Sequence, residues 1–174
     1  DLLVSDAQLD LVREGIDMAL RFGPLSDSGH HACLVRDAYR VACASPAYLQ
    51  AHGVPTNPRE LEHHRCIIYY VRGERYAQWN FSQAQSGVEW SIKAHADLVC
   101  NDASIAQQWA LQGRGILYAS ELAVVQALRS GDLVRLFPDY VCDAAPLYAV
   151  FPNARFVSAK VRSAIEFLST RLEA

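Results

Sequence analysis

The sequence predicts an α/β protein built from two lobes. Two stretches, residues 2–20 and 98–118, each contain an apolar strand, a helix and a second apolar strand. In both stretches a short polar residue follows the first strand and begins the helix, as is typical of parallel strand–helix–strand units. The chain ends with an apolar strand and an amphipathic helix over 147–172. We therefore expect the chain to leave a first lobe, build a second, and return to the first.

The first of these units opens the chain. Leu2 to Val4 predict the end of a buried strand, and Ser5 predicts the N-cap of a helix over 6–14. Gln8 stands three residues after Ser5, the spacing of a capping box. Gly15 is expected to end the helix with a positive φ. A second, parallel strand is predicted from three alternating apolar residues, Ile16, Met18 and Leu20.

The middle of the chain predicts strands and short helices. After a loop at 25–32, the expected elements are strands at 33–35 and 39–44, a helix that Ser45 and Pro46 begin and Gly53 ends, a helical turn at 58–62, a strand at 66–71 and an irregular stretch at 72–77. Two runs, 79–82 and 88–92, alternate apolar and polar residues and predict a hairpin. The apolar positions of this hairpin are expected in the core: Trp79, Phe81, Val88, Trp90 and Ile92.

The second strand–helix–strand unit begins with a strand at 98–100. Asn101 or Asp102 is expected to cap the helix, Gly113 to end it, and residues 116–118 to form the next strand. The buried stripe of this helix is predicted to contain Ile105, Ala106, Trp109 and Ala110.

The rest of the chain predicts a return to the first lobe. We expect Ser120 to cap a helix over 121–129, then a strand at 133–137, an irregular stretch at 138–146 and a strand at 147–151. The final helix shows apolar residues at helical spacing: Val157, Val161, Ala164, Ile165, Leu168 and Leu172.

Composition excludes several classes of protein. The net charge of −3 gives no electrostatic footprint for DNA or an anionic membrane. The sequence contains neither an apolar run of about 18 residues nor a signal peptide. Its five cysteines are odd in number and widely spaced, which favours reduced thiols in a cytosolic protein. A redox pair of Cys66 with Cys100 stays open as the alternative.

Motifs for catalysis, metals and cofactors are missing from the sequence. The paired histidines, His30–His31 and His63–His64, lack the spacing of metal ligands, and we interpret them as surface or capping residues. The sequence has no G-x-S-x-G elbow, P-loop or dinucleotide-binding glycine pattern. We therefore expect no enzyme activity, metal or cofactor, and a binding module remains. Ser5, Asn101 and Asp102 stand at helix starts beyond strand ends, where open α/β sheets bind ligands, although each also fits a simple cap.

Several motifs together resemble one family. They are D-L-V-R-E-G-I-D-M-A-L-R-F-G-P-L-S-D-S at 10–28, C-A-S-P-A-Y-L at 43–49, H-G-V-P-T-N-P-R-E-L-E-H-H-R-C-I at 52–67, W-N-F at 79–81, N-D-A-S at 101–104, G-R-G-I at 113–116 and P-L-Y-A-V-F-P at 146–152. In order and spacing the chain resembles the effector-binding domain of the LysR-type transcriptional regulators.

The resemblance implies a two-lobed fold like that of type 2 periplasmic binding proteins. Lobe one is expected to comprise 1–44 and 144–174, and lobe two 45–143. Hinge residues are expected where the chain crosses between the lobes, at Cys43, Ala44, Ala145 and Pro146. The first strand and helix of lobe one, and the N-terminal winged helix-turn-helix of such regulators, should precede Asp1.

The resemblance also implies what the chain does. A small metabolite should bind in the cleft between the lobes, at Ser5, Arg21, Tyr69, Asn101 and Asp102. Arg21 and the two helix N-termini favour an anionic effector. The helices at 6–14 and 103–112 should form a homodimer, or a tetramer built from it, in the bacterial cytoplasm. Contact with DNA is expected only through the missing N-terminal domain, and none with a membrane.

Two alternatives stay open at this point. A periplasmic solute-binding protein of a transport system would share the fold and would be preceded by a signal peptide. A degenerate enzyme of the same fold would need a catalytic residue, which the sequence does not show. What precedes Asp1 in the gene discriminates the regulator from the transport protein.

Overall fold

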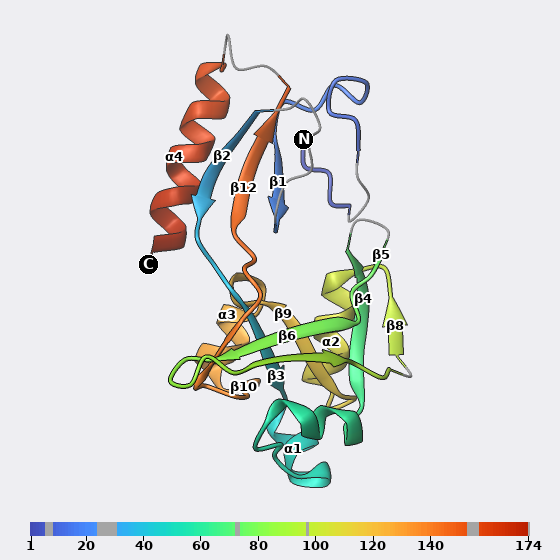
Figure 1. Cartoon of the computed structure of the whole chain (residues 1–174). Coiled ribbons are helices and arrows are strands. Elements are labelled where there is room, and N and C mark those ends of the chain that lie inside the picture. Colours follow the sequence, from blue (N-terminus) through green and yellow to red (C-terminus); the bar gives the residue numbers. More distant parts are fainter. Residues whose placement is uncertain (6–8, 24–30, 72–73, 97, 153–156, 174) are drawn as a thin grey trace. The chain divides into compact units, whose positions relative to one another are not determined.

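A computed structural model describes residues 1–5, 9–23, 31–71, 74–96, 98–152 and 157–173, and it confirms the predicted α/β class (Figure 1). Contacts divide the chain into two compact units. Unit 1 comprises Asp1–Gln8 and Arg40–Asp143, and unit 2 comprises Leu9–Tyr39 and Ala144–Ala174. The expected lobe one differs from unit 2, because it also included residues 1–8 and 40–44, which belong to unit 1. That the two units act as the regulatory lobes of the family stays a prediction.

Unit 1 is organised around a six-stranded sheet of order β10-β3-β9-β4-β5, in which β8 also pairs with β4. Its strands are β3 (Arg40–Ala44), β4 (Cys66–Val71), β5 (Glu74–Arg75), β8 (Leu98–Cys100), β9 (Ile116–Ser120) and β10 (Val134–Arg135). The central strand β4 is parallel to both β8 and β9, whereas β3 is antiparallel to β9. The carboxyl ends of β4, β8 and β9 therefore lie at the same edge as the start of β3.

Two layers cover this sheet. On one face α2 (Ala103–Leu111) and α3 (Glu121–Ser130) enclose a core cluster that contains Val41 and Ile67. The other face carries a three-stranded antiparallel sheet of order β11-β6-β7, together with α1 and the 3₁₀ helix η1. These elements are α1 (Pro46–His52), η1 (Pro58–His63), β6 (Gln78–Gln83), β7 (Glu89–Lys93) and β11 (Tyr140–Cys142).

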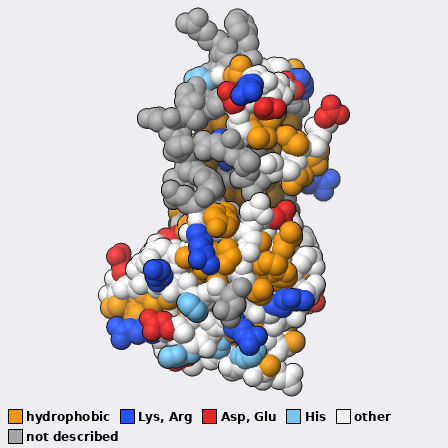
Figure 2. Space-filling model, turned by 90° about the vertical axis from the view of Figure 1, so that its right-hand side faces the viewer, with side chains coloured by type: hydrophobic (Ala, Val, Ile, Leu, Met, Phe, Trp, Pro, Cys, Tyr) orange, Lys and Arg blue, Asp and Glu red, His pale blue; other side chains and the backbone are white. Residues whose placement is uncertain are grey.

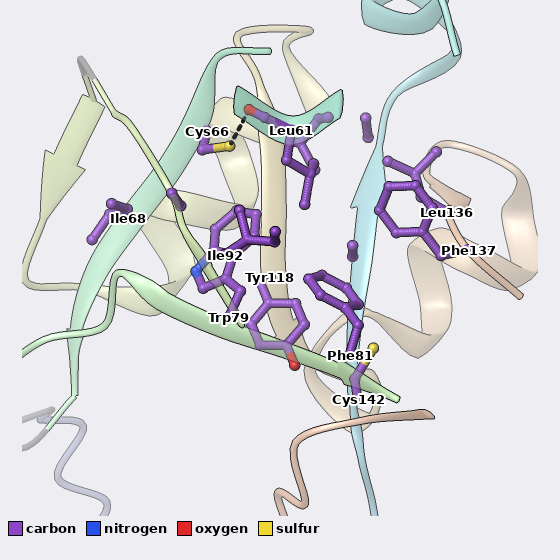
Figure 3. Packing of buried hydrophobic residues seen from close by; sticks show 14 of the residues in the cluster. Leu61, Cys66, Ile68, Trp79, Phe81, Ile92, Tyr118, Leu136, Phe137 and Cys142 are labelled. Carbon is purple, nitrogen blue, oxygen red and sulfur yellow. Dashed lines mark hydrogen bonds between the residues drawn. The ribbon is translucent and has the colours of Figure 1, made fainter. Parts of the chain in front are cut away.

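Aromatic rings fill the second of these cores. Figure 3 shows the ring of Tyr118 between Trp79 and Phe81, with Phe137 beyond Phe81. The ring centres of Trp79 and Tyr118 lie 5.1 Å apart, and those of Phe81 and Phe137 lie 5.5 Å apart in an edge-to-face contact. Such pairs add to the stability that burial of their area gives. The prediction that the hairpin contributes to the core is thus confirmed for Trp79, Phe81 and Ile92.

Local capping signals correctly predicted where several helices begin and end. The Ser45 hydroxyl accepts from the amide of Tyr48 at 3.3 Å, and Gly53 ends α1 with a φ of 85°. The carboxylate of Asp102 accepts from the amides of Ser104 and Ile105, so Asp102 is the cap of α2. The predicted β8–α2–β9 unit, the hairpin of β6 and β7, the strand β4 and the turn η1 are confirmed.

Other expectations in unit 1 were wrong. Val88 and Ile105 are 47% and 45% exposed, because each side chain lies on the outer face of its element. The Ser120 hydroxyl makes no capping hydrogen bond to α3. The strand predicted at 133–137 shrinks to β10, since Phe137 has a φ of 53° that a strand cannot continue. Pairing with neighbouring strands creates β5 and β11 in two stretches expected to be irregular, 72–77 and 138–146.

The cysteines of the described residues are free thiols. Cys66 begins β4, whereas Cys100 pairs with Tyr69 near the far end of that strand. Cys66 and Cys100 therefore form no disulfide with each other, and the alternative of a redox pair is wrong. Within the described ranges, no helix is long and apolar enough to cross a membrane, and no cluster of three or more potential metal ligands is found.

Unit 2 contains a three-stranded antiparallel sheet and a long helix. The sheet has the order β1-β12-β2, with β1 at Ala19–Phe22, β2 at His31–Arg36 and β12 at Leu147–Phe151. Helix α4 (Ala159–Glu173) packs against β2 and buries Val161. The predicted final strand and helix are thus confirmed, and so is the predicted strand after Gly15, although β1 begins at Ala19.

The opening of the chain differs most from its prediction. Leu2, Leu3 and Val4 are at least 65% exposed and form no strand, and β1 pairs antiparallel with β12 instead of parallel with residues 2–4. An apolar run favours burial, but a strand also needs a neighbour whose backbone it can pair with. Gln8 of the predicted capping box lies outside the described residues.

Within the helix expected over 6–14, the described residues form a single capped turn. The Asp10 carboxylate accepts from the amides of Val12 and Arg13, so Asp10 is its cap. The Gly15 amide donates to Val12 and the Ile16 amide to Leu11, the hydrogen-bond pattern of a Schellman motif. Gly15 has the predicted positive φ, 65°. The stop signal was interpreted correctly, but it ends one turn rather than a helix.

Gly115 is expected to tolerate no side chain. A Cβ there would lie 2.7 Å from the carbonyl oxygen of Arg65, which accepts the amide of Ile116. Gly115→Ala should therefore force the start of β9 away from β4 and lower the free energy of unfolding by about 1–3 kcal/mol. Urea unfolding measures this change. Ser104→Ala, on the exposed side of α2, is the control and should change the stability little. An unchanged midpoint for Gly115→Ala would show that the two segments do not approach so closely.

Candidate functional site

Arg40 is a buried cation at the start of a strand that is otherwise apolar. It opens β3 and lies opposite Ser120, the last residue of β9, while Tyr69 pairs with Cys100 near the ends of β4 and β8. All four residues therefore lie at one edge of the unit 1 sheet, beyond which open α/β sheets bind their ligands. We call Arg40, Tyr69, Tyr76, Tyr118, Ser120 and Asp143 the edge cluster.

Tyrosines surround the guanidinium. Only 5% of Arg40 is exposed, and its Nη1 donates to the hydroxyl of Tyr69 at 2.8 Å. Its Cζ lies 4.0 Å from the ring centre of Tyr76 and 5.9 Å from that of Tyr118, which are cation–π distances. Within the described part of the chain, no carboxylate is recorded in an ion pair with Arg40. A buried charge usually has such a partner, so this arrangement is unusual.

The tyrosines keep Arg40 charged. Burial is the largest single effect and lowers the pKa of Arg40, but electrostatic interactions with Tyr69, Tyr76 and Tyr118 and the hydrogen bond to Tyr69 together raise it more. The net result is a pKa above the usual value for arginine. Burial also raises the pKa of Tyr76 to about 12 and raises the pKa of Tyr118. At neutral pH the cluster therefore contains one guanidinium beside the neutral phenols of Tyr76 and Tyr118.

Asp143 is held on the other side of these phenols. Its carboxylate lies 3.0 Å from the hydroxyls of both Tyr76 and Tyr118, and it accepts from the backbone and side-chain nitrogens of Asn80 at 3.3 and 3.0 Å. The Asp143 amide in turn donates to the Tyr118 hydroxyl at 2.9 Å. The carboxylate is thus engaged by four groups and does not pair with Arg40.

Ser120 adds an unused polar group. It is 4% exposed, and its Oγ has no hydrogen-bond partner among the described residues. Opposed residues in an antiparallel pair project from the same face of the sheet, so the side chains of Ser120 and Arg40 share a face. The hydroxyl that was predicted to cap α3 is instead an unsatisfied group beside a buried cation.

The predicted effector-binding residues fall into two groups. Tyr69 belongs to the edge cluster, and Asn101 and Asp102 follow β8 at the same edge. The Asp102 carboxylate is occupied as the cap of α2, at 2.8 and 3.0 Å from two amides, whereas Asn101 is exposed. Ser5 is exposed and lies outside any helix. Arg21 lies in unit 2, where its guanidinium donates to the carbonyl of Leu9 at 2.9 Å. Their roles in binding stay predictions.

The predicted hinge residues lie near the two places where the chain passes between the units. Cys43 and Ala44 are fully buried in β3, and burial raises the pKa of the Cys43 thiol to about 12. The Ala145 amide donates to Ala38 at 2.7 Å, and the Pro146 carbonyl accepts from Gly23. Between them, the Arg40 amide donates to the Asp143 carbonyl at 2.8 Å, which pairs the outgoing and returning segments. A hinge at these positions stays a prediction.

Sequence reasoning missed most of the edge cluster. The sequence patterns predicted no binding role for Arg40, Tyr76 or Asp143, and Ser120 was predicted only to cap a helix. One sequence signal could have indicated Arg40: it is a charged residue directly before the apolar run V-A-C-A, which predicts a buried strand. The remaining members are brought together only by pairing between distant strands.

Comparisons with known proteins agree on one family. The family model described as the LysR substrate binding domain matches residues 1–173. The HTH-type transcriptional activator TtdR of Escherichia coli K12 is 34% identical over 164 residues, which are 94% of this chain and 52% of the relative. The HTH-type transcriptional regulator DmlR of the same strain is 33% identical over 165 residues, covering 95% of this chain and 53% of that protein. The chain thus spans about half the length of these relatives.

Solved structures share the fold. The regulatory domain of CrgA, a LysR-type transcriptional regulator from Neisseria meningitidis, is 28% identical with a TM-score of 0.77, over 92% of this chain and 78% of that one. The full-length virulence activator AphB of Vibrio cholerae has a TM-score of 0.77 at 23% identity, covering 98% of this chain and 57% of its own. The second likeness supports the fold alone.

The Tyr118 hydroxyl should stabilise unit 1 through Asp143. Tyr118→Phe keeps the ring packing but leaves the Asp143 amide and carboxylate without this partner. We expect the free energy of unfolding to fall by about 1–3 kcal/mol, the usual cost of such an unsatisfied group. Urea unfolding monitored by tryptophan fluorescence gives the value. The matched control is Tyr140→Phe, since the Tyr140 ring packs on Phe137 in the same core. Equal losses in the two variants would argue against the Asp143 contact.

Proposed function

We propose, because this chain belongs to the LysR substrate-binding domain family, that it is the effector-sensing and dimerisation domain of a bacterial transcriptional regulator. Its relatives TtdR and DmlR are named as transcriptional regulators and not as enzymes or transport proteins. The alternative of a solute-binding protein is therefore not favoured. We infer that the domain catalyses no reaction and acts in the cytoplasm, where a regulator meets DNA.

DNA binding belongs, in this proposal, to a part of the regulator outside this chain. The curated relatives are about twice as long as the matched region. On the face drawn in Figure 2, basic and acidic side chains are interspersed, and the described residues form no large patch of one sign. This agrees with the net charge of −3, which gives the domain itself no attraction for phosphate backbones.

A small-molecule effector should bind at the strand-end edge of unit 1. The observation that carries this proposal is the convergence of Tyr69, Asn101 and the start of α2 at the carboxyl ends of β4 and β8. Ser5 and Arg21 remain the residues predicted to complete the site from the opening of the chain. The effector controls DNA binding only through its different affinities for two arrangements of the domain, since a ligand with equal affinity for both shifts nothing.

A thermal-shift screen of small acids and aromatic metabolites tests this proposal on the 174-residue chain. At least one compound should raise the melting temperature in a saturable manner, because binding to the folded state alone adds stability. Asn101→Ala and Ser5→Ala should weaken the effect of that compound, whereas Gln108→Ala, on the exposed side of α2, should not. A screen without a saturable hit, or a hit that both site variants leave unchanged, would contradict the proposed site.

Dimerisation should involve the outer face of α2. Ile105 was expected in the core, but it is 45% exposed on this helix. An isologous two-fold contact would bury it against a second copy. Sedimentation velocity at micromolar concentration should therefore show a dimer, or a tetramer of such dimers. Ile105→Glu should shift the chain toward monomer, while Val88→Glu, at a similarly exposed apolar residue next to β7 in the other layer of unit 1, should leave the assembly intact. A monomeric wild-type chain would refute this interface.

A further inference from the structure

The edge cluster contains a positive charge that no carboxylate of the described residues balances in an ion pair. Arg40 is 5% exposed and contacts the hydroxyl of Tyr69 and the rings of Tyr76 and Tyr118. Hydroxyl groups and ring faces lower the cost of burying a guanidinium, but they carry no full negative charge. Asp143 is the acidic member of the cluster, yet four other contacts engage its carboxylate.

Two further polar groups of the edge cluster remain able to donate hydrogen bonds. The Tyr69 hydroxyl accepts from Nη1 of Arg40, which leaves its own proton for another acceptor. The Ser120 hydroxyl is buried without a partner among the described residues, on the sheet face that Arg40 shares. Buried polar groups are normally hydrogen-bonded, so an unsatisfied hydroxyl beside a cation is evidence for an acceptor that binds there.

We infer that Arg40 anchors a carboxylate of the effector, with Tyr69 and Ser120 as additional donors. This inference rests on the proposed function, because it assigns the ligand class of the same strand-end site. The planar guanidinium matches the two oxygens of a carboxylate, and hydrogen bonds to such a charged acceptor are strong. The effector is then an organic acid bound by Arg40, whereas Arg21, which donates to a backbone carbonyl in unit 2, is not its anchor.

Charge balance favours a carboxylate over inorganic phosphate. One guanidinium compensates one negative charge, while a phosphate dianion would leave an excess negative charge in a cluster that already contains Asp143. The ring faces of Tyr76 and Tyr118 also suit the carbon skeleton of an organic acid. The site should therefore prefer an acid to its amide, and a carboxylate to phosphate, and simple compounds suffice to measure both preferences.

The experiment compares matched acids and amides on the full chain. Acetate, propionate and benzoate are titrated against acetamide, propionamide and benzamide, with inorganic phosphate as a further probe, at constant ionic strength. Thermal shift and calorimetry should show saturable binding of at least one carboxylate, and much weaker binding of its amide and of phosphate. Arg40→Gln should weaken that carboxylate roughly tenfold or more, as expected for the loss of a charge-assisted hydrogen bond.

Companion variants keep the result interpretable if Arg40→Gln unfolds. Arg40→Lys retains the charge without the planar fork and should bind with intermediate affinity. Ser120→Ala and Tyr69→Phe each remove one donor and should each reduce affinity by a smaller factor. Arg114→Gln, at an exposed arginine just beyond α2, should bind like the wild type, while Arg21→Gln tests the competing arginine that was predicted from the sequence.

Each other outcome overturns the inference in a recognisable way. Equal binding of acid and amide, equal or better binding of phosphate, or a loss confined to Arg21→Gln would show that Arg40 is not the carboxylate anchor. A neutral metabolite whose binding depends on Asn101 but not on Arg40 would leave the proposed function intact and reject this inference. A chain that binds none of the probes and none of the screened metabolites would reject both.

Discussion

Tyr118 joins the apolar core of unit 1 to the charged groups at its edge. Its ring packs against Trp79 and Phe81, at centre distances of 5.1 and 5.4 Å, while its hydroxyl contacts Asp143. Arg40 lies over the neighbouring ring of Tyr76. A residue that is apolar along its body and polar at its tip is suited to this place. The position of the edge cluster therefore depends on packing that begins in the middle of the sheet.

Burial of charge is the constraint that this packing must satisfy. The cluster separates its guanidinium from its carboxylate by neutral phenols, so that each charge is hydrogen-bonded without an ion pair between them. A direct buried ion pair would stabilise little, because desolvation offsets most of the attraction. Both charges lie beside the crossings at 39–40 and 143–144, where the chain passes from one unit to the other.

The opening of the chain shows the limit of local patterns. The stop signal predicted at Gly15 is confirmed, because the structure has a Schellman motif there. The described residues 9–15, however, form one turn, which Asp10 caps. Short helices are marginal without tertiary packing, and an apolar strand without a pairing partner stays exposed. Similar patterns at 98–118 gave the predicted unit because β4 lies between β8 and β9 and pairs with both.

The sequence by itself determined the α/β class, the hairpin of β6 and β7, the capped helices α1 and α2, the final strand and helix, and the family. These features depend on hydrophobic periodicity, helix caps and sequence motifs, all of which are patterns of residues close together in the sequence. Only the tertiary structure decided which polar groups meet. Arg40, Tyr69, Tyr118 and Asp143 come from separate elements, and their neighbourhood follows from strand register and burial. The sequence predicted Arg21 as an anion-binding residue, which stays a prediction, and it could not show that Arg40 is buried without a paired carboxylate among the described residues.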